Sequence, residues 1–196
     1  MGHSQAEKAE SRGRIIEVAA RQIREGGLES VSIAEIMKAA KLTHGGFYGH
    51  FPSRAALIAA ALKRALDRGE AAFAAAKSAK GSVSVKSMLN GYLSPAHRDD
   101  IRDGCAIAAL SGDVGRAEDD EIREEMMRSL ERSFEDMAEA MGGGPKAEAA
   151  AVAAWCAMVG AVSLSRVFRG TRRSDEILRT VRRSILDLEA TVRDGE

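Results

Sequence analysis

The side chains best suited to chemistry are concentrated in one short stretch, residues 43–54, which reads THGGFYGHFPSR. It combines hydroxyl, imidazole and guanidinium groups, all of which bond phosphate oxygens or base edges in nucleic acids. No Asp or Glu occurs from residue 36 to residue 66, although the whole chain carries 29 acidic residues. A surface without carboxylates tolerates a polyanion. The stretch therefore favours contact with nucleic acid.

Three glycines, Gly45, Gly46 and Gly49, stand in what we expect to be a short helix that begins after Thr43. Each costs about 1 kcal/mol relative to Ala in a helix interior. A close approach of the backbone to DNA would explain that cost. The second helix of a helix-turn-helix places its N-terminal residues nearest the bases. We therefore predict that Thr43, His44, Gly45 and Gly46 face the bases.

A second group of polar residues is expected to contact phosphates, which set the register of docking. Tyr48 and His50 lie one turn further along the predicted helix, and Arg54 opens the next one. Arg12 and Arg14, near the start of the chain, are placed to clamp the DNA backbone on the other side.

The elements that must position these groups are readable. Apolar residues at four-residue spacing predict a helix over 12–25, which the glycines at 26 and 27 end. Ser32 and Glu35 have the spacing of a capping box, so a second helix begins there. Phe47 and Phe51 lie four residues apart, and we expect them to pack inward.

The rest of the chain predicts further helices and no strands. A linker is expected over 77–84 and a charged loop over 94–104, and Ser174 is expected to cap the last helix. The helices are predicted over 54–76, 85–92, 105–111, 118–141, 146–168 and from 174 onward.

Three segments carry a resemblance to a known family. RIIEVAA (14–20), GGLESVSIAEI (26–36) and LTHGGFYGHFPSRAAL (42–57) resemble the N-terminal domain of the TetR/AcrR transcriptional regulators. The resemblance implies an all-α homodimer with a helix-turn-helix domain over 11–71 (motif 32–51) and a ligand-binding and dimerisation domain over 72–196, about nine helices in all.

The resemblance implies a DNA-binding regulator that binds a palindromic double-stranded operator, and we expect it to act as a repressor. A small-molecule effector would release it. Arg54 matches a position where the family usually has Lys. Gly46 and Gly49 depart from the family pattern, where side chains are common, which implies fewer base contacts and more reliance on backbone and DNA shape.

The same resemblance implies where a dimer would form. The last two helices would pack with those of a second subunit as a four-helix interface. The apolar face of the last helix supplies the predicted contacts: Ile177, Leu178, Val181, Ile185 and Leu188.

An effector pocket is expected between the helices of the second domain. The candidate lining residues are apolar, aromatic or sulfur-bearing, although core packing also explains such a set: Met88, Leu89, Tyr92, Cys105, Met126, Phe134, Trp155 and Met158.

Cys105 is the sharper candidate, because it opens a short helix whose free amides lower a thiol pKa. The segment around it resembles TetR-family repressors of the N-ethylmaleimide-responsive type, which implies a redox or electrophile sensor. A small buried core residue is the alternative. We expect Cys156, inside an apolar helix, to be inert.

Other classes of function are disfavoured. Two cysteines without metal spacing predict neither a disulfide framework nor a zinc site, and suit a cytoplasmic protein. We expect no metal, no cofactor, no catalytic residue, no signal peptide and no membrane partner. The most apolar stretch, 147–168, contains Glu148 and Arg166. A small helical enzyme using the charged residues 97–100, or a protein-binding adaptor without a DNA role, remain the alternatives.

Overall fold

The computed structural model describes residues 5–80 and 83–194 of the 196. Every regular element in these residues is helical, which confirms the all-α prediction. The α-helices and the two short 3-10 helices (η) follow the order α1 Gln5–Gly26, η1 Leu28–Ser30, α2 Ile33–Ala39, η2 His44–Gly49, α3 Arg54–Lys80, α4 Val85–Tyr92, α5 Pro95–Asp99, α6 Ala106–Arg116, α7 Asp120–Ala140, α8 Gly144–Val167 and α9 Arg172–Asp194.

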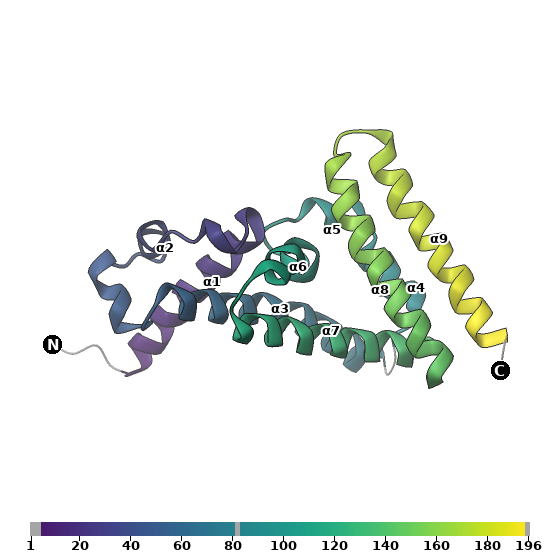
Figure 1. Cartoon of the computed structure of the whole chain (residues 1–196), viewed down its shortest axis with the longest axis horizontal. Helices are drawn as coiled ribbons and strands as arrows, with labels where there is room; N and C mark the ends of the chain where they lie inside the picture. Colours follow the sequence, from purple (N-terminus) through teal and green to yellow (C-terminus); the bar gives the residue numbers. More distant parts are fainter. Residues whose placement is uncertain (1–4, 81–82, 195–196) are drawn as a thin grey trace.

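The helices form an elongated molecule with two ends (Figure 1). α1, α2 and η2 make one end, and α8 and α9 stand side by side at the other. α3 runs the length between them, with α7 alongside and α6 above. The predicted domain boundary at residue 71 therefore falls inside one continuous helix, so no flexible linker separates the two parts at that point.

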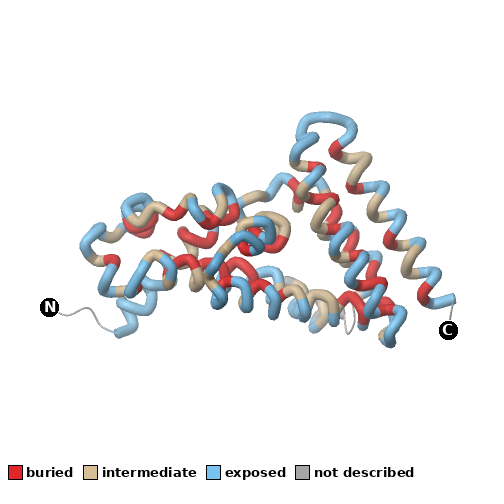
Figure 2. Tube along the Cα trace, viewed as in Figure 1, coloured by how far each residue is buried: buried red, intermediate tan, exposed pale blue. Residues whose placement is uncertain are grey.

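Two hydrophobic clusters form the core, one at each end (Figure 2). The first joins α1, α2, η2 and the first half of α3 to α6 and the start of α7. The second joins α4 and the end of α7 to α8 and α9. α6 lies late in the sequence but packs into the N-terminal core, so it connects the two parts physically.

The predicted caps are partly right. The Ser32 hydroxyl accepts a hydrogen bond from the Glu35 amide at 3.4 Å, and the Ser53 hydroxyl accepts one from the Ala56 amide at 3.0 Å. Thr43 makes no side-chain cap at η2. Ser174 is not a cap either, because it lies inside α9 and is buried.

The segment predicted as a charged loop contains a helix, α5, which Ser94 caps. This helix is held in place by a buried arginine, whose burial the charged composition of the segment does not indicate. The guanidinium of Arg98 donates to the Ser174 hydroxyl and to the carboxylates of Asp99 and Asp175, at 2.7–2.9 Å. These contacts fasten α5 to α9. Arg98 and Asp99 are therefore engaged in holding α5 against α9.

The expected linker over 77–84 is mostly wrong, because α3 continues to Lys80. Residues 81 and 82 lie outside the described residues. The expected dimer stripe on α9 also needs correction. Leu178 and Ile185 are each only 2% exposed and pack against α8 of their own chain.

The exposed apolar face of the bundle lies on α8 instead. Val152, Leu164 and Val167 are exposed on this helix, and so is Cys156, although the helix is apolar nearly all round. By length and composition alone, α8 is also the one helix among the described residues that could cross a membrane. It packs between α7 and α9, as the central helix of a bundle does.

Candidate nucleic-acid interface and internal cavity

The tip of the molecule presents the residues that the sequence predicted would face bases. η2 is a single short 3-10 helix, and Thr43, His44 and Gly45 at its start are exposed. Tyr48 is 74% exposed, which is unusual for a tyrosine and leaves its hydroxyl available at the surface. His50 is half-buried. The tip therefore displays hydrogen-bonding groups without any carboxylate between them.

The glycines of the tip are not required by the fold. A Cβ built on Gly45 or Gly49 would meet no atom within 4 Å, and one on Gly46 would make only ordinary contacts, the nearest at 3.5 Å from the Thr43 hydroxyl. None of the three has a positive φ angle. The protein could therefore accommodate side chains at these positions.

The aromatic residues of the tip divide as predicted. Phe47 and Phe51 are each 1% exposed and stack with ring centroids 5.9 Å apart. They belong to the same core cluster as Ile36 and Leu57. The guanidinium carbon of Arg12 lies 4.7 Å from the centre of the Phe51 ring. This cation–π contact holds Arg12 next to the tip. Arg14 is exposed and pairs with Glu10 at 2.7 Å.

The sequence predicted that Arg54 contacts a phosphate, but in the structure its side chain is bonded to the backbone of its own chain. Its Nε and Nη2 donate to the backbone carbonyls of Val31, Leu28 and Glu29 at 3.0–3.2 Å. These bonds tie the start of α3 to η1. Arg54 thus positions the helix-turn-helix by closing the loop before α2.

Lys41 is a further basic residue of the tip, within the run that contains no Asp or Glu. It has a φ of 61° in the turn between α2 and η2, and it is exposed beside Lys38. The Leu42 amide donates to the Met37 carbonyl at 2.9 Å across the same turn. A left-handed residue other than glycine is uncommon, so this lysine adopts its conformation at an energetic cost.

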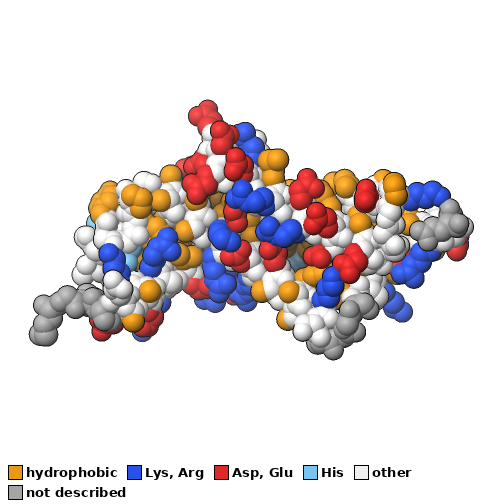
Figure 3. Space-filling view, turned by 90° about the horizontal axis from the view of Figure 1, so that it is seen from below, with side chains coloured by type: hydrophobic (Ala, Val, Ile, Leu, Met, Phe, Trp, Pro, Cys, Tyr) orange, Lys and Arg blue, Asp and Glu red, His pale blue; other side chains and the backbone are white. Residues whose placement is uncertain are grey.

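The basic surface is narrower than the acid-free run of sequence implied. Lys63 pairs with Asp67 at 2.7 Å, and Arg64 pairs with Glu17 at 2.9 Å. Figure 3 shows basic and acidic side chains intermingled over the middle of the molecule. These positive charges are neutralised locally, so within the acid-free run the surface suited to a polyanion narrows to the tip.

A cavity of about 420 Å³ lies between α3, α4, α6, α7 and α8. Five of the eight predicted pocket residues line it: Met88, Tyr92, Cys105, Trp155 and Met158. Leu89 and Met126 do not, because they are buried in the two hydrophobic clusters. Phe134 does not line it either, because another face of α7 is turned to the cavity.

That face of α7 is polar, and the sequence analysis missed it. Ser129, Arg132, Ser133 and Asp136 line the cavity. Their spacing of i, i+3, i+4 and i+7 marks one side of a helix. This polar spacing is visible in the sequence, but the expectation of an apolar pocket does not include polar residues.

The Cys105 thiol lies at the junction of the cavity and α6. Its sulfur accepts hydrogen bonds from the Tyr92 hydroxyl at 3.2 Å and from the Ala108 amide at 3.4 Å. Burial raises the pKa of Tyr92 well above its usual value, so the phenol stays a donor. Cys105 is half-buried and reachable from the cavity, so it is neither a sealed core residue nor a surface thiol.

His97 supports Tyr92 from the other side. The two rings lie 4.5 Å apart between centroids, and Nδ1 of His97 is 2.7 Å from the Tyr92 carbonyl oxygen. Burial lowers the pKa of His97, which favours the neutral ring. A carbonyl only accepts, so Nδ1 carries the proton and Nε2 remains an acceptor.

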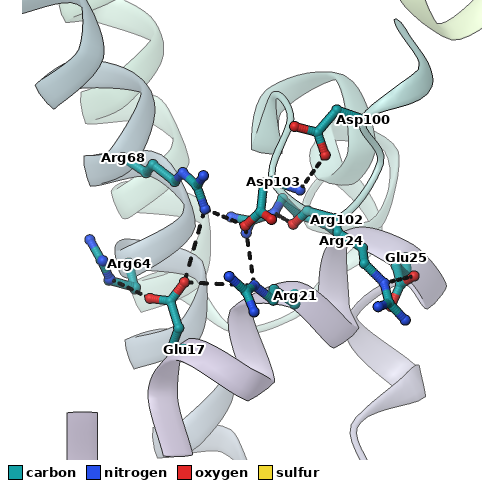
Figure 4. A network of polar contacts seen from close by, with 9 residues as sticks. All are labelled: Glu17, Arg21, Arg24, Glu25, Arg64, Arg68, Asp100, Arg102 and Asp103. Carbon is teal, nitrogen blue, oxygen red and sulfur yellow. Dashed lines mark hydrogen bonds and ion pairs between the residues drawn. The ribbon is translucent and has the colours of Figure 1, made fainter. Parts of the chain in front are cut away.

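A network of charged side chains joins the cavity to the N-terminal helices (Figure 4). Asp103, which lines the cavity, accepts hydrogen bonds from Arg68 of α3 and, at 3.2 Å, from Arg21 of α1. Arg24 of α1 lies 3.5 Å from the same carboxylate oxygen, and its Nε donates to the Arg102 carbonyl at 2.5 Å. We call the set formed by Asp103 with these arginines the junction network.

Two features make the junction network rigid. The Arg24 side chain is only 1% exposed, so its charge is hardly solvated by water. A Cβ on Gly104 would lie 2.0 Å from the Asp100 carbonyl oxygen, so the turn that carries Asp103 closes only with glycine. The turn leads directly into Cys105, and the same short segment therefore touches both α1 and the cavity.

Comparison with known proteins agrees with this architecture. Residues 15–61 match the family model described as bacterial regulatory proteins, tetR family. An uncharacterized HTH-type transcriptional regulator of Mycobacterium tuberculosis is 29% identical over 188 residues, which cover 89% of this chain and 94% of that protein.

Solved structures share the fold over nearly the whole length. A TetR transcriptional regulator from Chloroflexus aurantiacus has a TM-score of 0.78 at 22% identity, covering 96% of this chain and 97% of that one. The reduced form of NemR from E. coli has a TM-score of 0.72 at 17% identity, covering 90% and 95%. The likeness therefore extends beyond the helix-turn-helix to the helices around the cavity.

Proposed function

Because the chain is a DNA-binding transcriptional regulator of the TetR family, we propose that it binds a palindromic operator as a homodimer and acts as a repressor. An effector in the cavity, or modification of Cys105, releases it from DNA. The observation that carries this proposal is the junction network (Figure 4), because it connects a cavity large enough for a small molecule to α1 and α3, which share a hydrophobic cluster with Phe47 and Phe51 of the tip.

At the tip, the bases meet Thr43, His44 and the backbone at Gly45, while Tyr48 binds a phosphate. The space around the glycines supports this arrangement, because it lets the groove edge approach the helix closely. Arg12 and Arg14 reach the backbone from α1, and Lys41 joins them. Arg54 acts by holding the helix-turn-helix in place.

The dimer forms through the exposed face of α8, with α9 beside it. Val152, Cys156, Gly160 and Leu164 recur at four-residue spacing along this helix, and three of them are exposed apolar or sulfur-bearing side chains. A Cβ on Gly160 would meet nothing within 4 Å, which leaves room for a second helix to approach. Ile177, Val181 and Leu188 of α9, half-buried in one chain, border this surface.

Release follows from differential binding. A ligand shifts an equilibrium only if it binds one state better than the other. A ligand that displaces the turn at Asp103 moves α1 relative to α3, because both helices hold that carboxylate. The two tips of a dimer then no longer match sites one helical turn of DNA apart, about 34–36 Å.

Thiol chemistry at Cys105 provides a second route to the same movement. Alkylation adds bulk at the N-cap of α6, on the sulfur that accepts the hydrogen bond from the Tyr92 hydroxyl. The similar E. coli structure is described as a reduced form, which fits a fold in which redox state matters.

We expect N-ethylmaleimide to lower the DNA affinity of the wild-type chain at least about tenfold, and Cys105→Ser to abolish that response without changing basal affinity. The measurement is fluorescence anisotropy of labelled DNA before and after treatment. Cys156→Ser is the matched control, since Cys156 is the other of the two cysteines, and it should stay sensitive. Equal release of Cys105→Ser and wild type would refute the thiol route.

The alternative functions, a protein-binding adaptor and a small helical enzyme, do not require an exposed basic tip. We expect neither enzymatic turnover nor a membrane partner. We expect the chain to act in the cytoplasm. Selection of binding sites from random duplex DNA separates these functions. We expect a palindrome to be enriched, whereas recovery of no enriched duplex would exclude the DNA-bound dimer.

A further inference from the structure

We propose that the cavity is selective for organic cations, namely ligands with an apolar or aromatic body and an ammonium group held by Asp136. This rests on the proposed role of the cavity as the effector site and assigns the chemistry of its occupant.

The walls of the cavity suit an apolar body. Its lining contains aliphatic side chains and three aromatic residues from different helices, Phe73, Tyr92 and Trp155. The rings of Tyr92 and Trp155 meet edge to face, with centroids 5.4 Å apart. A volume of about 420 Å³ accommodates a small ligand of this kind.

The positive charges of the lining are already committed to carboxylates. Arg68 donates to Asp103 of the junction network. Arg132 donates to Glu70 at 2.5 Å, and the Ser129 hydroxyl donates to the same oxygen at 2.9 Å. His97, the remaining basic group, is kept neutral by burial, which lowers its pKa. An anionic ligand would therefore have to break an existing pair.

Asp136 is the opposite case. It lines the cavity, it is half-buried, and the described residues give it no hydrogen bond or ion pair. Burial raises its pKa, and the carboxylates of Glu139, Glu135 and Glu70 act in the same direction. Lys77, whose charge acts in the opposite direction, is bonded to Glu139 at 2.6 Å. Among the described residues that act on Asp136, three carboxylates therefore oppose one lysine, and the resulting negative potential attracts a cation.

The polar groups beside Asp136 point to the same ligand. The indole Nε1 of Trp155 donates to the Ser133 carbonyl at 2.6 Å, and the Tyr92 hydroxyl donates to Cys105. Their donors are occupied, so these residues offer a ligand mainly their ring faces, which attract cations. His97 adds an acceptor at Nε2. The lining therefore combines free acceptors and ring faces with donors that are in use.

Trp155 provides the assay, because it is the single tryptophan of the chain and it lines the cavity. The probes are 4-phenylbutyltrimethylammonium, its uncharged analogue with carbon in place of nitrogen, and 5-phenylpentanoate. We expect the cation to quench Trp155 fluorescence with an affinity at least about tenfold higher than the neutral probe, and the anion to bind more weakly than either.

Asp136→Asn should lower the affinity for the cation about tenfold and leave the affinity for the neutral probe unchanged. Glu131→Gln is the matched control, because it removes one charge from the same helix α7 at an exposed position outside the lining, and its carboxylate is not among those that act on Asp136. It should keep the preference for the cation. A neutral probe that binds as tightly as the cation, or a preference that survives in Asp136→Asn, would overturn the proposal.

The assay distinguishes this inference from the proposed function. A chain that binds selected DNA but shows no preference for the cation contradicts the ligand class alone. A chain that prefers the cation but enriches no DNA contradicts the regulator role alone, since the fluorescence titration needs no DNA.

Discussion

Replacing Gly45 by leucine is expected to abolish specific DNA binding while leaving the fold as stable as before. The backbone at Gly45 has no positive φ angle, and a side chain there would meet nothing in the protein. Leucine is also favoured over glycine in a helix by about 1 kcal/mol. We therefore expect the melting temperature to stay the same or to rise by about 2–4 °C.

The same side chain would occupy the space that the groove edge needs. We expect the affinity for a selected operator to fall at least about 100-fold, equivalent to about 2.7 kcal/mol. Fluorescence anisotropy and thermal unfolding give the two readouts. Gly115→Leu is the matched control, because Gly115 is an exposed helical glycine with equally open surroundings on α6. If Gly45→Leu bound DNA like the control, the tip would not be the base-reading surface.

The second large effect concerns the junction network. Asp103→Asn keeps the shape of the side chain but removes the charge that compensates Arg24, whose side chain is almost wholly buried. Removing one partner of a buried pair costs about 3–5 kcal/mol when both groups are inaccessible. Asp103 is 25% exposed and its other two arginines are about half exposed, so we expect a loss of about 2 kcal/mol in the free energy of unfolding.

The loss of stability in Asp103→Asn is expected to depend on pH, because the pKa of Asp103 differs between the folded and unfolded states. Burial alone would raise the pKa of Asp103, but hydrogen bonds and charges from Arg21 and Arg68 outweigh it and lower the pKa. A lowered folded-state pKa contributes stability that is present above the unfolded value of about 3.9 and is lost as pH falls through the folded value. The difference between wild type and Asp103→Asn should therefore shrink below about pH 4.

Urea unfolding at neutral and acidic pH measures both effects. Asp120→Asn is the control, because Asp120 forms only an exposed pair with Arg123 and its loss should change stability by less than about 0.5 kcal/mol. A difference for Asp103→Asn that is absent at pH 7, or that persists undiminished at pH 3, would contradict the role of this carboxylate.

The sequence predicted the N-terminal part best, because its elements are specified locally. Ser32 and Glu35 mark a helix start, and the inward pair Phe47 and Phe51 follows from helical spacing. Each of these signals lies within a few residues of the structure that it specifies. The family match over residues 15–61 covers the same segment.

The cavity and the junction network could be predicted only in part, because their partners are far apart in the chain. Arg24 and Asp103 are 79 residues apart, and nothing near Arg24 in the sequence shows that it is buried. Arg54 illustrates the same limit. A basic residue at the start of a helix suggests a phosphate contact, but here its partners are the carbonyls of η1.

The assignment of buried faces on α8 and α9 failed for a related reason. Apolar spacing identifies a face that must be covered, but not what covers it. Leu178 and Ile185 are covered by α8 of the same chain. The apolar character of α8 all round concealed that one side of it, with Cys156 and Leu164, remains exposed.

The salt dependence of binding to the selected palindrome tests most directly that two basic tips of a dimer grip DNA. We predict two chains per duplex, and a plot of log affinity against log salt concentration with a slope steeper than about −4, as for a complex that neutralises several phosphates. An affinity independent of salt, or one chain per duplex, would contradict the account.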